Sequence, residues 1–192
     1  MGKILVTGGC GYIGSHTIVE LIQLGYEVVC IDDLSNSDGS AIAGIESITG
    51  VKVKNTKISV GDSVALQTFF KEEGPIEAVI HFAAFKAVNE SVIFPLKYYQ
   101  NNLASLLVLI ETMKDYHCNN LIFSSSCSVY GDAETLPVNE QTPLGVIQSP
   151  YARTKLIGEE ILKDCCIADP EFKVIALRYF KPAGAHISNF IG

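Results

Sequence analysis

Tyr151 and Lys155 lie four residues apart in the stretch SPYARTKLIGEE, which begins at Ser149. On a helix this spacing places both side chains on one face, close enough to touch. An ammonium group beside a phenol stabilises the phenolate, and lowering a tyrosine pKa by about three units requires roughly 4 kcal/mol. A tyrosine with such a pKa could remove a proton from an alcohol at neutral pH. One such pair arises readily by chance among eight tyrosines, so it indicates a base only in company with other signals.

A second signal lies near the N-terminus, where VTGGCGYIGSH follows a short apolar run. Gly8, Gly11 and Gly14 have the spacing GxxGxxG at the junction between a predicted strand and a predicted helix. Glycines there permit a tight turn and a close approach of the backbone to a pyrophosphate, which the free N–H groups of the helix start can bind. A glycine pattern of this kind is often only a turn, so its context has to decide.

An acidic residue at the end of the second predicted strand supplies that context. Asp32 can accept hydrogen bonds from the ribose hydroxyls of adenosine, whereas its neighbour Asp33 is expected to be solvated. The stretch DDLSNSDGS contains no Lys or Arg to meet a 2′-phosphate, so the sequence favours NAD over NADP. Asp62, in VGDS, could contact the adenine edge, and a turn-forming Gly-Asp pair explains it equally well.

Three consecutive serines, Ser124 to Ser126, follow another apolar run. Ligands of open α/β sheets bind at the carboxyl ends of the strands, so a serine hydroxyl there could orient the alcohol that Tyr151 deprotonates. A serine cluster after a strand is usually a polar loop or a cap. The same sequence also contains the glycine loop, the acidic strand end and the Tyr/Lys pair, in that order. We therefore prefer the interpretation that a serine of this run binds the substrate alcohol.

Short apolar runs alternate with amphipathic segments along the whole chain. The runs predict strands at Lys3–Thr7, Glu27–Ile31, Val51–Val60, Glu77–Phe82, Asn120–Ser125 and Lys173–Tyr179. The amphipathic segments predict helices at Pro95–Tyr116 and Pro150–Cys166, with a weaker signal at Ile42–Ile48. This alternation predicts an α/β fold with a Rossmann-like, doubly wound parallel sheet and helices on both faces. The segment Tyr130–Gln148 is expected to be a long loop of functional importance.

Composition restricts the possible partners. The 192 residues are 48% hydrophobic and 18% charged, which suits one domain with a sizeable core. A net charge of −7 argues against nucleic acid or an anionic membrane surface as a partner. The six cysteines show no CxxC or zinc spacing, so we expect reduced thiols and no metal site. The sequence shows no signal peptide and no apolar run of membrane-spanning length, so we expect a cytoplasmic protein.

The sequence resembles the extended short-chain dehydrogenase/reductase superfamily, and within it the UDP-glucose 4-epimerases. The matching stretches run in family order and are VTGGCGYIGSH, VIHFAAFKAVNES, PLKYYQNN, FSSSCSVYGD, SPYARTK and LRYFKPAGAH. The resemblance implies an enzyme that keeps NAD bound and interconverts UDP-galactose and UDP-glucose through a 4-keto sugar and transient NADH. It also implies a homodimer packed through two helices.

The resemblance further implies roles for individual residues. Tyr151 would be the base on the sugar 4-hydroxyl and Ser126 its hydrogen-bonding partner, while Lys155 would hold the nicotinamide ribose and lower the tyrosine pKa. The implied cofactor-binding residues are Gly8, Gly11, Tyr12, Ile13, Gly14, Asp32, Asn36, Ser37, Asp62, Phe82, Ala83, Lys86, Asn101, Tyr151, Lys155 and Phe180. The implied substrate-binding residues are Lys86, Ser126, Tyr151 and Lys181.

Some positions depart from the epimerase pattern. Ala84 and Phe85 stand where Gly and Leu are typical, and Asn89 replaces a usual Gly. Lys181 replaces an asparagine that helps to hold the nucleotide sugar; a lysine can pair with a diphosphate but lacks the acceptor of an amide. Family members continue into a C-terminal sugar-nucleotide domain. We therefore expect residues 1–180 to form the NAD-binding domain, residues 181–192 to begin a truncated substrate-binding region, and the chain to be inactive alone.

Two other interpretations stay open. A non-catalytic NAD-binding module would keep the cofactor site and lose the substrate site; Lys181 and the missing C-terminal domain favour it, whereas the intact Ser, Tyr and Lys set opposes it. A nucleotide-sugar 4,6-dehydratase would carry an acid pair directly after the serine run, where this chain has Cys127 and Ser128. The dehydratase is therefore the weaker alternative.

Overall fold

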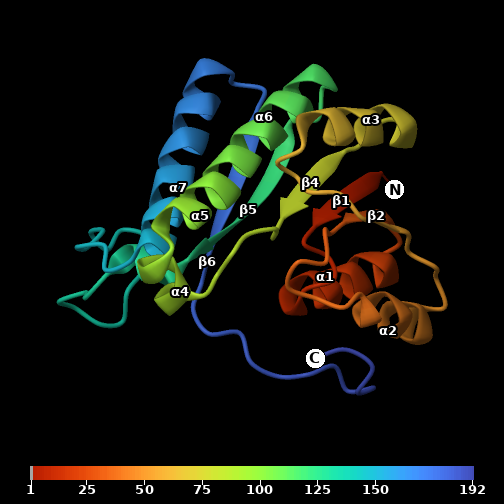
Figure 1. Ribbon diagram of the computed structural model, residues 1–192, viewed down its shortest axis with the longest axis horizontal. Helices are drawn as coiled ribbons and strands as arrows, with labels where there is room; N and C mark the ends of the chain where they lie inside the picture. The colour runs from red at the N-terminus through yellow and green to blue at the C-terminus, as the bar shows by residue number, and fades with distance from the viewer. Residues whose placement is uncertain (1) are drawn as a thin grey trace.

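Six parallel strands form one sheet in the order β3-β2-β1-β4-β5-β6 in the computed structural model, which describes residues 2–192 (Figure 1). The strands are β1 (Lys3–Thr7), β2 (Glu27–Ile31), β3 (Asn55–Thr56), β4 (Ala78–His81), β5 (Asn120–Ser126) and β6 (Lys173–Tyr179). The strand order reverses between β1 and β4, and open α/β sheets bind their ligands in the crevice at such a point. The predicted Rossmann-like fold is confirmed.

Helices cover both faces of the sheet. On one face lie α1 (Tyr12–Gln23) and α2 (Ser40–Thr49), and on the other lie α3 (Ser63–Glu73), α6 (Ser105–Asp115) and α7 (Pro150–Ala168). The short helices α4 (Val88–Ile93) and α5 (Pro95–Tyr99) precede α6 and pack beside α7 (Figure 1). The weak helical signal at Ile42–Ile48 corresponds to α2.

Side chains of the central strands alternate between two buried clusters. Leu5 and Val79 face α3, α6 and α7, whereas Ile4 and Val6 face α1 and α2. The strands are apolar on both sides because a central parallel strand is covered on both faces. On β6 the pattern changes: Ile175 is 60% exposed, so no described helix covers the face of β6 that carries it.

The third predicted strand is much shorter in the structure. Of the range Val51–Val60, only Asn55–Thr56 pairs, opposite Cys30 and Ile31 at the edge of the sheet. VKVKNTKISV contains several lysines, which are common in edge strands. An edge strand can form backbone hydrogen bonds with a neighbouring strand on one side only. Few bonds therefore hold this segment in an extended conformation.

The helix predicted over Pro95–Tyr116 contains a π-helical segment, Gln100–Ala104. Its Asn102 side chain points inward, where Oδ1 accepts the Phe85 N–H at 2.9 Å and Nδ2 donates to the Phe85 carbonyl at 3.0 Å. Nδ2 also donates to the Thr154 hydroxyl at 3.1 Å. These bonds tie the widened turn to the loop after β4 and to α7, and the periodicity of the sequence gives no sign of them.

Helix α7 begins as predicted and ends two residues later than predicted, at Ala168. A proline occupies its first position, and the Ser149 hydroxyl caps it by accepting the Ala152 N–H at 3.2 Å. The preceding segment Tyr130–Gln148 contains no helix or strand, apart from the end of the short 3₁₀ turn η2 (Cys127–Tyr130). The predicted long loop is therefore confirmed.

The last residues fold back over α1 and α2 (Figure 1). Ile191 is buried in the cluster beneath α2, where a Cβ on Gly44 would lie 2.3 Å from a backbone oxygen of this segment. The Tyr12 hydroxyl donates to the Gly184 carbonyl at 2.7 Å. Gly184 and Ile191 thus join this segment to the first domain, and its part in a substrate-binding region stays a prediction.

All six cysteines are free thiols. Among residues 2–192, no helix combines the length and the apolar character needed to cross a membrane.

Candidate functional site

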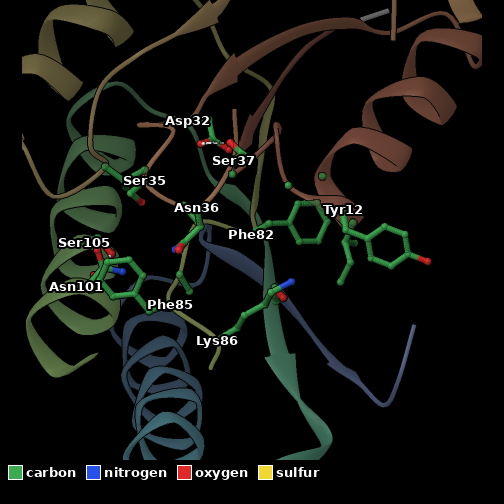
Figure 2. A pocket seen from close by; sticks show the side chains of 18 of the residues that line it. Tyr12, Asp32, Ser35, Asn36, Ser37, Phe82, Phe85, Lys86, Asn101 and Ser105 are labelled. Atoms are coloured by element: carbon green, nitrogen blue, oxygen red, sulfur yellow. Dashed lines mark hydrogen bonds between the residues drawn. The ribbon is translucent and has the colours of Figure 1, made fainter. Parts of the chain in front are cut away.

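A cavity of about 780 Å³ opens at the carboxyl ends of the strands. Its walls come from the loops that follow β1 to β4 and from the ends of β5 and β6, as expected for a ligand site in an open α/β sheet. Figure 2 shows Asp32 and Ser37 on one wall, Asn101 on another, and Lys86 of the loop after β4 apart from both. The volume lies in the range of small-molecule and cofactor sites.

Most residues singled out from the sequence line this cavity. They are Gly8, Gly11, Tyr12, Ile13, Gly14, Asp32, Asn36, Ser37, Phe82, Ala83, Lys86, Asn101, Ser126, Tyr151, Lys155 and Phe180. Asp62 and Lys181 lie outside the lining. Asp62 caps α3 by accepting the Ala65 N–H at 3.0 Å, and Lys181 is exposed to solvent. The cap uses Oδ1 of Asp62, and the contact of this carboxylate with the adenine edge stays a prediction.

The loop after β1 leaves the start of α1 open. Gly8 has a φ of +70°, which favours glycine, and a Cβ on Gly14 would lie only 2.3 Å from the Gly8 carbonyl oxygen. Loop and helix therefore pack too closely for a side chain at Gly14. No side chain of the described residues caps α1, so the N–H groups of its first turn remain available to an anion.

Asp32 organises the loops on either side of it. Its Oδ2 accepts the Cys10 N–H at 3.0 Å, and its Oδ1 accepts the Leu34 N–H at 2.9 Å and the Ser37 hydroxyl at 3.4 Å (Figure 2). A carboxylate offers about four acceptor positions, so Asp32 retains acceptor capacity toward a ligand. It faces the cavity from the end of β2.

Helix α7 places two chemically useful side chains against the end of β5. Lys155 Nζ donates to the Ser124 carbonyl at 2.7 Å and lies 5.9 Å from the centre of the Tyr151 ring. Ser126 and Tyr151 line the same cavity, and the Ser126 hydroxyl accepts from the Ser128 N–H at 3.2 Å and from the Ser128 hydroxyl at 2.8 Å. The predicted pair and the serine run are therefore brought together at one wall of the cavity.

Burial dominates the electrostatics of this wall. It raises the pKa of Tyr151, with Ser126 opposing the rise and Cys127 adding to it. Lys155, whose ammonium group donates to the Ser124 carbonyl, does not offset this rise, and its predicted effect on the phenol stays a prediction. Burial also lowers the pKa of Lys155 itself, to about 8. Desolvation penalises the charged form of both groups and here outweighs their mutual attraction.

His81 lies in the same buried region. Its Nδ1 is 2.7 Å from the Thr7 hydroxyl, and its ring stacks on Phe123. Burial, and then the charge of Lys155, lower the pKa of His81 to about 3. His81 is therefore neutral at physiological pH and leaves the positive charge to Lys155.

The buried ammonium of Lys155 should cost folding stability. Because its folded pKa of about 8 lies below the ordinary value of 10.5, the unfolded chain binds this proton more tightly, and stability rises between these two pH values. We expect Lys155→Met to gain in free energy of unfolding relative to wild type below pH ~8, with the gain shrinking toward pH ~10. Urea denaturation of both chains at the two pH values measures this difference, and a gain that grows with pH would contradict it.

Some residues that line the cavity were not predicted from the sequence. Glu90 and Tyr98 reach the cavity from α4 and α5, and the Tyr98 hydroxyl donates to Glu90 Oε2 at 2.7 Å. Burial, helped by Glu90, raises the pKa of Tyr98 to about 12. Their position depends on the interrupted helix between β4 and β5, which no spacing in the sequence reveals. Ser125, by contrast, belongs to the serine run that the sequence does show.

The chain matches the NAD dependent epimerase/dehydratase family over residues 4–192. It is 51% identical to the UDP-glucose 4-epimerase of Dictyostelium discoideum over 190 residues, which are 99% of this chain and 55% of that relative. It is 51% identical to the UDP-glucose 4-epimerase of Bacillus subtilis over 189 residues, 98% of this chain and 55% of that relative. Among solved structures, UDP-glucose 4-epimerase from Bifidobacterium longum in complex with NAD+ and UDP matches with a TM-score of 0.96 at 46% identity, covering 99% of this chain and 56% of that one.

The chain spans about half the length of the curated relatives it matches. Within that span the match includes both walls of the cavity, the glycine loop as well as the helix of Tyr151 and Lys155. The resemblance inferred from the sequence motifs is thereby confirmed. The chain belongs to the NAD dependent epimerase/dehydratase family.

Proposed function

We propose that the cavity binds NAD and a UDP-linked hexose, and that the whole enzyme interconverts UDP-galactose and UDP-glucose. One observation carries the proposal: Ser126, Tyr151 and Lys155 line the same cavity as the glycine loop and Asp32. The residues that could transfer a proton and those that could bind a dinucleotide therefore face one cavity, where a sugar and a cofactor could lie side by side. The similarity to UDP-glucose 4-epimerases, one of them solved with NAD+ and UDP, supports this substrate class.

The residues present fit a dinucleotide. The uncapped first turn of α1, approached closely by Gly8 and Gly14, would receive the pyrophosphate. Asp32 would accept the hydroxyls of the adenosine ribose, and Lys155 would bind those of the nicotinamide ribose. Of the described lining residues, the Lys and Arg side chains are those of Lys86 and Lys155, and neither is in the loop after β2. The cavity therefore favours NAD over NADP.

In this proposal the side chains handle the proton and the orientation of the sugar. Tyr151 takes the proton of the 4-hydroxyl, and Ser126, beside the phenol, holds the same oxygen by a hydrogen bond. Lys155, fixed on the Ser124 carbonyl, stabilises the phenolate before the proton is transferred back. Bound NAD supplies the acceptor and donor of the C4 hydride, and its positive nicotinamide ring favours the ionised form of the phenol. Because C4 inverts, the sugar must present its other face before Tyr151 returns the proton.

The two alternatives account for the site less well. A 4,6-dehydratase needs an acid after the serine run, and the structure places Cys127 and Ser128 there in the turn η2. Glu90 does line the cavity, but Lys97 and Tyr98 already bind its carboxylate. A non-catalytic module was suggested by Lys181, which lies outside the lining. That departure therefore leaves the catalytic wall unchanged.

Asp32→Ala should weaken NAD binding by about 10- to 100-fold, because hydrogen bonds to a charged acceptor contribute roughly 1.5–3 kcal/mol. Asp38→Ala is the matched control, since Asp38 lies in the same loop outside the cavity lining. Titration calorimetry of the three chains with NAD and with NADP measures the effect. Wild-type chain that binds NADP as tightly as NAD would contradict the assignment of Asp32.

We also propose a homodimer formed through the helical layer of α4 to α6. Ile93, Leu96 and Leu107 are 68%, 73% and 46% exposed, and a second copy would cover them. Light scattering after gel filtration should give twice the chain mass of 20.8 kDa, and Leu96→Glu should return it to the monomer. A wild-type chain that stays monomeric at all concentrations would refute the dimer.

The direct test of the proposed function is an assay of UDP-galactose conversion with two proteins. One is the chain of residues 1–192, and the other is a chimera in which the C-terminal part of the Bacillus subtilis relative follows residue 192. We expect the chimera to form UDP-glucose and the chain alone to be inactive, because Phe180 of the cavity lining is 63% exposed and water has free access. A folded chimera that binds NAD and forms no UDP-glucose would refute the proposed function.

A further inference from the structure

A charged network behind the cavity has no part in the proposed proton transfer. The Ser125 hydroxyl donates to Glu159 Oε1. Arg178 holds the same carboxylate through Nε to Oε1 at 3.0 Å and Nη2 to Oε2 at 2.7 Å. Its Nη1 also donates to the Tyr130 hydroxyl at 3.0 Å. The network therefore connects four elements: β5, α7, β6 and the turn η2.

Glu159 continues the stripe of α7 that begins with Tyr151 and Lys155. The three residues recur every four positions, so they lie on one face of the helix. Lys155 donates to the Ser124 carbonyl and Glu159 accepts the Ser125 hydroxyl, while Tyr151 lines the cavity with Ser126, which lowers the pKa of its phenol. The stripe thus holds α7 to β5 at successive turns of the helix.

The contact at Glu159 contains an ion pair that is shielded from water. Ser125 is 2% exposed, and the side chains of Glu159 and Arg178 are 12% and 22% exposed. A bidentate pair of a guanidinium and a carboxylate is directional, and at this burial it is only weakly screened by water. Core packing and the bond from Asn102 to Thr154 already hold α7, and the contact at Glu159, one turn beyond Lys155, adds a restraint on the rotation of the helix at the end of β5.

We propose that Glu159, held by Arg178, is a positioning residue that fixes α7 against the end of β5 and so places the Tyr151 phenol at the Ser126 hydroxyl. This inference deepens the proposed function, in which Tyr151 is the base. An ion pair with a purely structural role would change the free energy of unfolding and leave the surroundings of Tyr151 as they are. A positioning role and a purely structural role of Glu159 therefore differ in whether the ionisation of the Tyr151 phenol changes.

The ionisation of Tyr151 reports its contact with Ser126. That contact lowers the pKa of the phenol, and the other titratable groups around it are Lys155 of α7, Cys127 of η2 and Tyr98 of α5. If α7 shifts and the contact with Ser126 is lost, the phenol ionises less readily. A neutral apolar side chain at position 159 leaves Arg178 without its counter-ion and should produce this shift.

The experiment uses residues 1–192 with carbon-13 at the tyrosine Cζ atoms, and the Tyr151→Phe variant identifies the Tyr151 resonance. The phenolate-to-phenol ratio of Tyr151 is compared among variants at one alkaline pH, the highest at which circular dichroism shows the fold intact. We expect Glu159→Leu to lower this ratio about tenfold, equivalent to one pKa unit. Glu159→Gln keeps one acceptor oxygen for Ser125 and Arg178 Nε and places a donor opposite Arg178 Nη2, so it should restore part of the ratio.

Glu160→Leu is the matched control, because Glu160 is an exposed neighbour on the same helix. A folded Glu159→Leu chain with the wild-type ratio would overturn the inference. Should that variant fail to fold, Ser125→Ala removes one hydrogen bond and keeps the ion pair; a smaller decrease supports the inference and an unchanged ratio overturns it. The measurement needs no turnover, so a protein that does not epimerise would refute the proposed function and leave this result standing.

Discussion

Tyr151→Phe is expected to reduce the conversion of UDP-galactose by about 10³-fold while NAD stays bound, because general acid–base catalysis contributes roughly 10²–10⁴-fold. Phenylalanine keeps the ring and loses only the hydroxyl that carries the proton. Lys155 cannot take over this task, since its Nζ is bound to the Ser124 carbonyl. Of the groups around the sugar oxygen in the proposed complex, Ser126 remains, and an unassisted serine hydroxyl is a very weak base.

Steady-state turnover of the chimera, together with its NAD content, measures this effect. Tyr116→Phe is the matched control: its hydroxyl donates to the Gln67 carbonyl at 3.0 Å, outside the cavity lining, so turnover should stay near the wild-type value. Near-normal turnover of Tyr151→Phe with unchanged NAD content would mean that the proton leaves by another route. Loss of NAD together with turnover would instead assign Tyr151 to cofactor binding.

Gly14→Ala is expected to lower the free energy of unfolding by about 1–3 kcal/mol and NAD affinity by about tenfold or more. The added methyl group would lie 2.3 Å from the Gly8 carbonyl oxygen and 2.8 Å from the Gly9 Cα. Both obstacles are backbone, so the glycine loop has to move away from α1. The pyrophosphate site built from this loop and this helix start would open with it.

Chemical denaturation and calorimetry with NAD follow the two effects of Gly14→Ala. Gly61→Ala is the matched control, because a Cβ there would meet only ordinary contacts, with Ser59 at 3.7 Å the nearest. This control should retain NAD affinity and lose little stability. A Gly14→Ala chain that binds NAD as the wild type does would show that the close packing of loop and helix is dispensable.

Strands and helices buried on one or both faces could be predicted from the sequence because burial imposes a period on the side chains. Runs such as KILVT and EVVCI are central strands in the structure. The prediction failed where the decisive contacts are distant. Residues Val51–Val60 have some alternation, yet as an edge segment they pair only at Asn55–Thr56. The π-helical turn depends on Asn102 reaching Phe85 and Thr154, partners that lie 17 and 52 residues away in the sequence.

The features of the site likewise divide into those set by local sequence patterns and those set by distant contacts. The glycine spacing, Asp32 and the Tyr/Lys pair are local patterns, and the structure brings them to one cavity. The direction of the tyrosine pKa was not predictable from spacing, because it depends on how deeply α7 is buried and on which acceptor Lys155 finds. Asp62 shows the converse case: its position after a strand did not predict that its carboxylate caps α3.

In the proposed function, bound NAD oxidises and re-reduces C4 of one sugar, and the hydrogen on that carbon does not exchange with water. The measurement is the fate of deuterium placed at C4 of UDP-galactose, followed by mass spectrometry and NMR of the UDP-glucose that the chimera forms. The proposed function predicts that the deuterium stays at C4 of the product, because Tyr151 exchanges only the oxygen-bound proton and the carbon-bound hydrogen never leaves the closed site. Deuterium lost to solvent, with hydrogen from water at C4, would contradict the account.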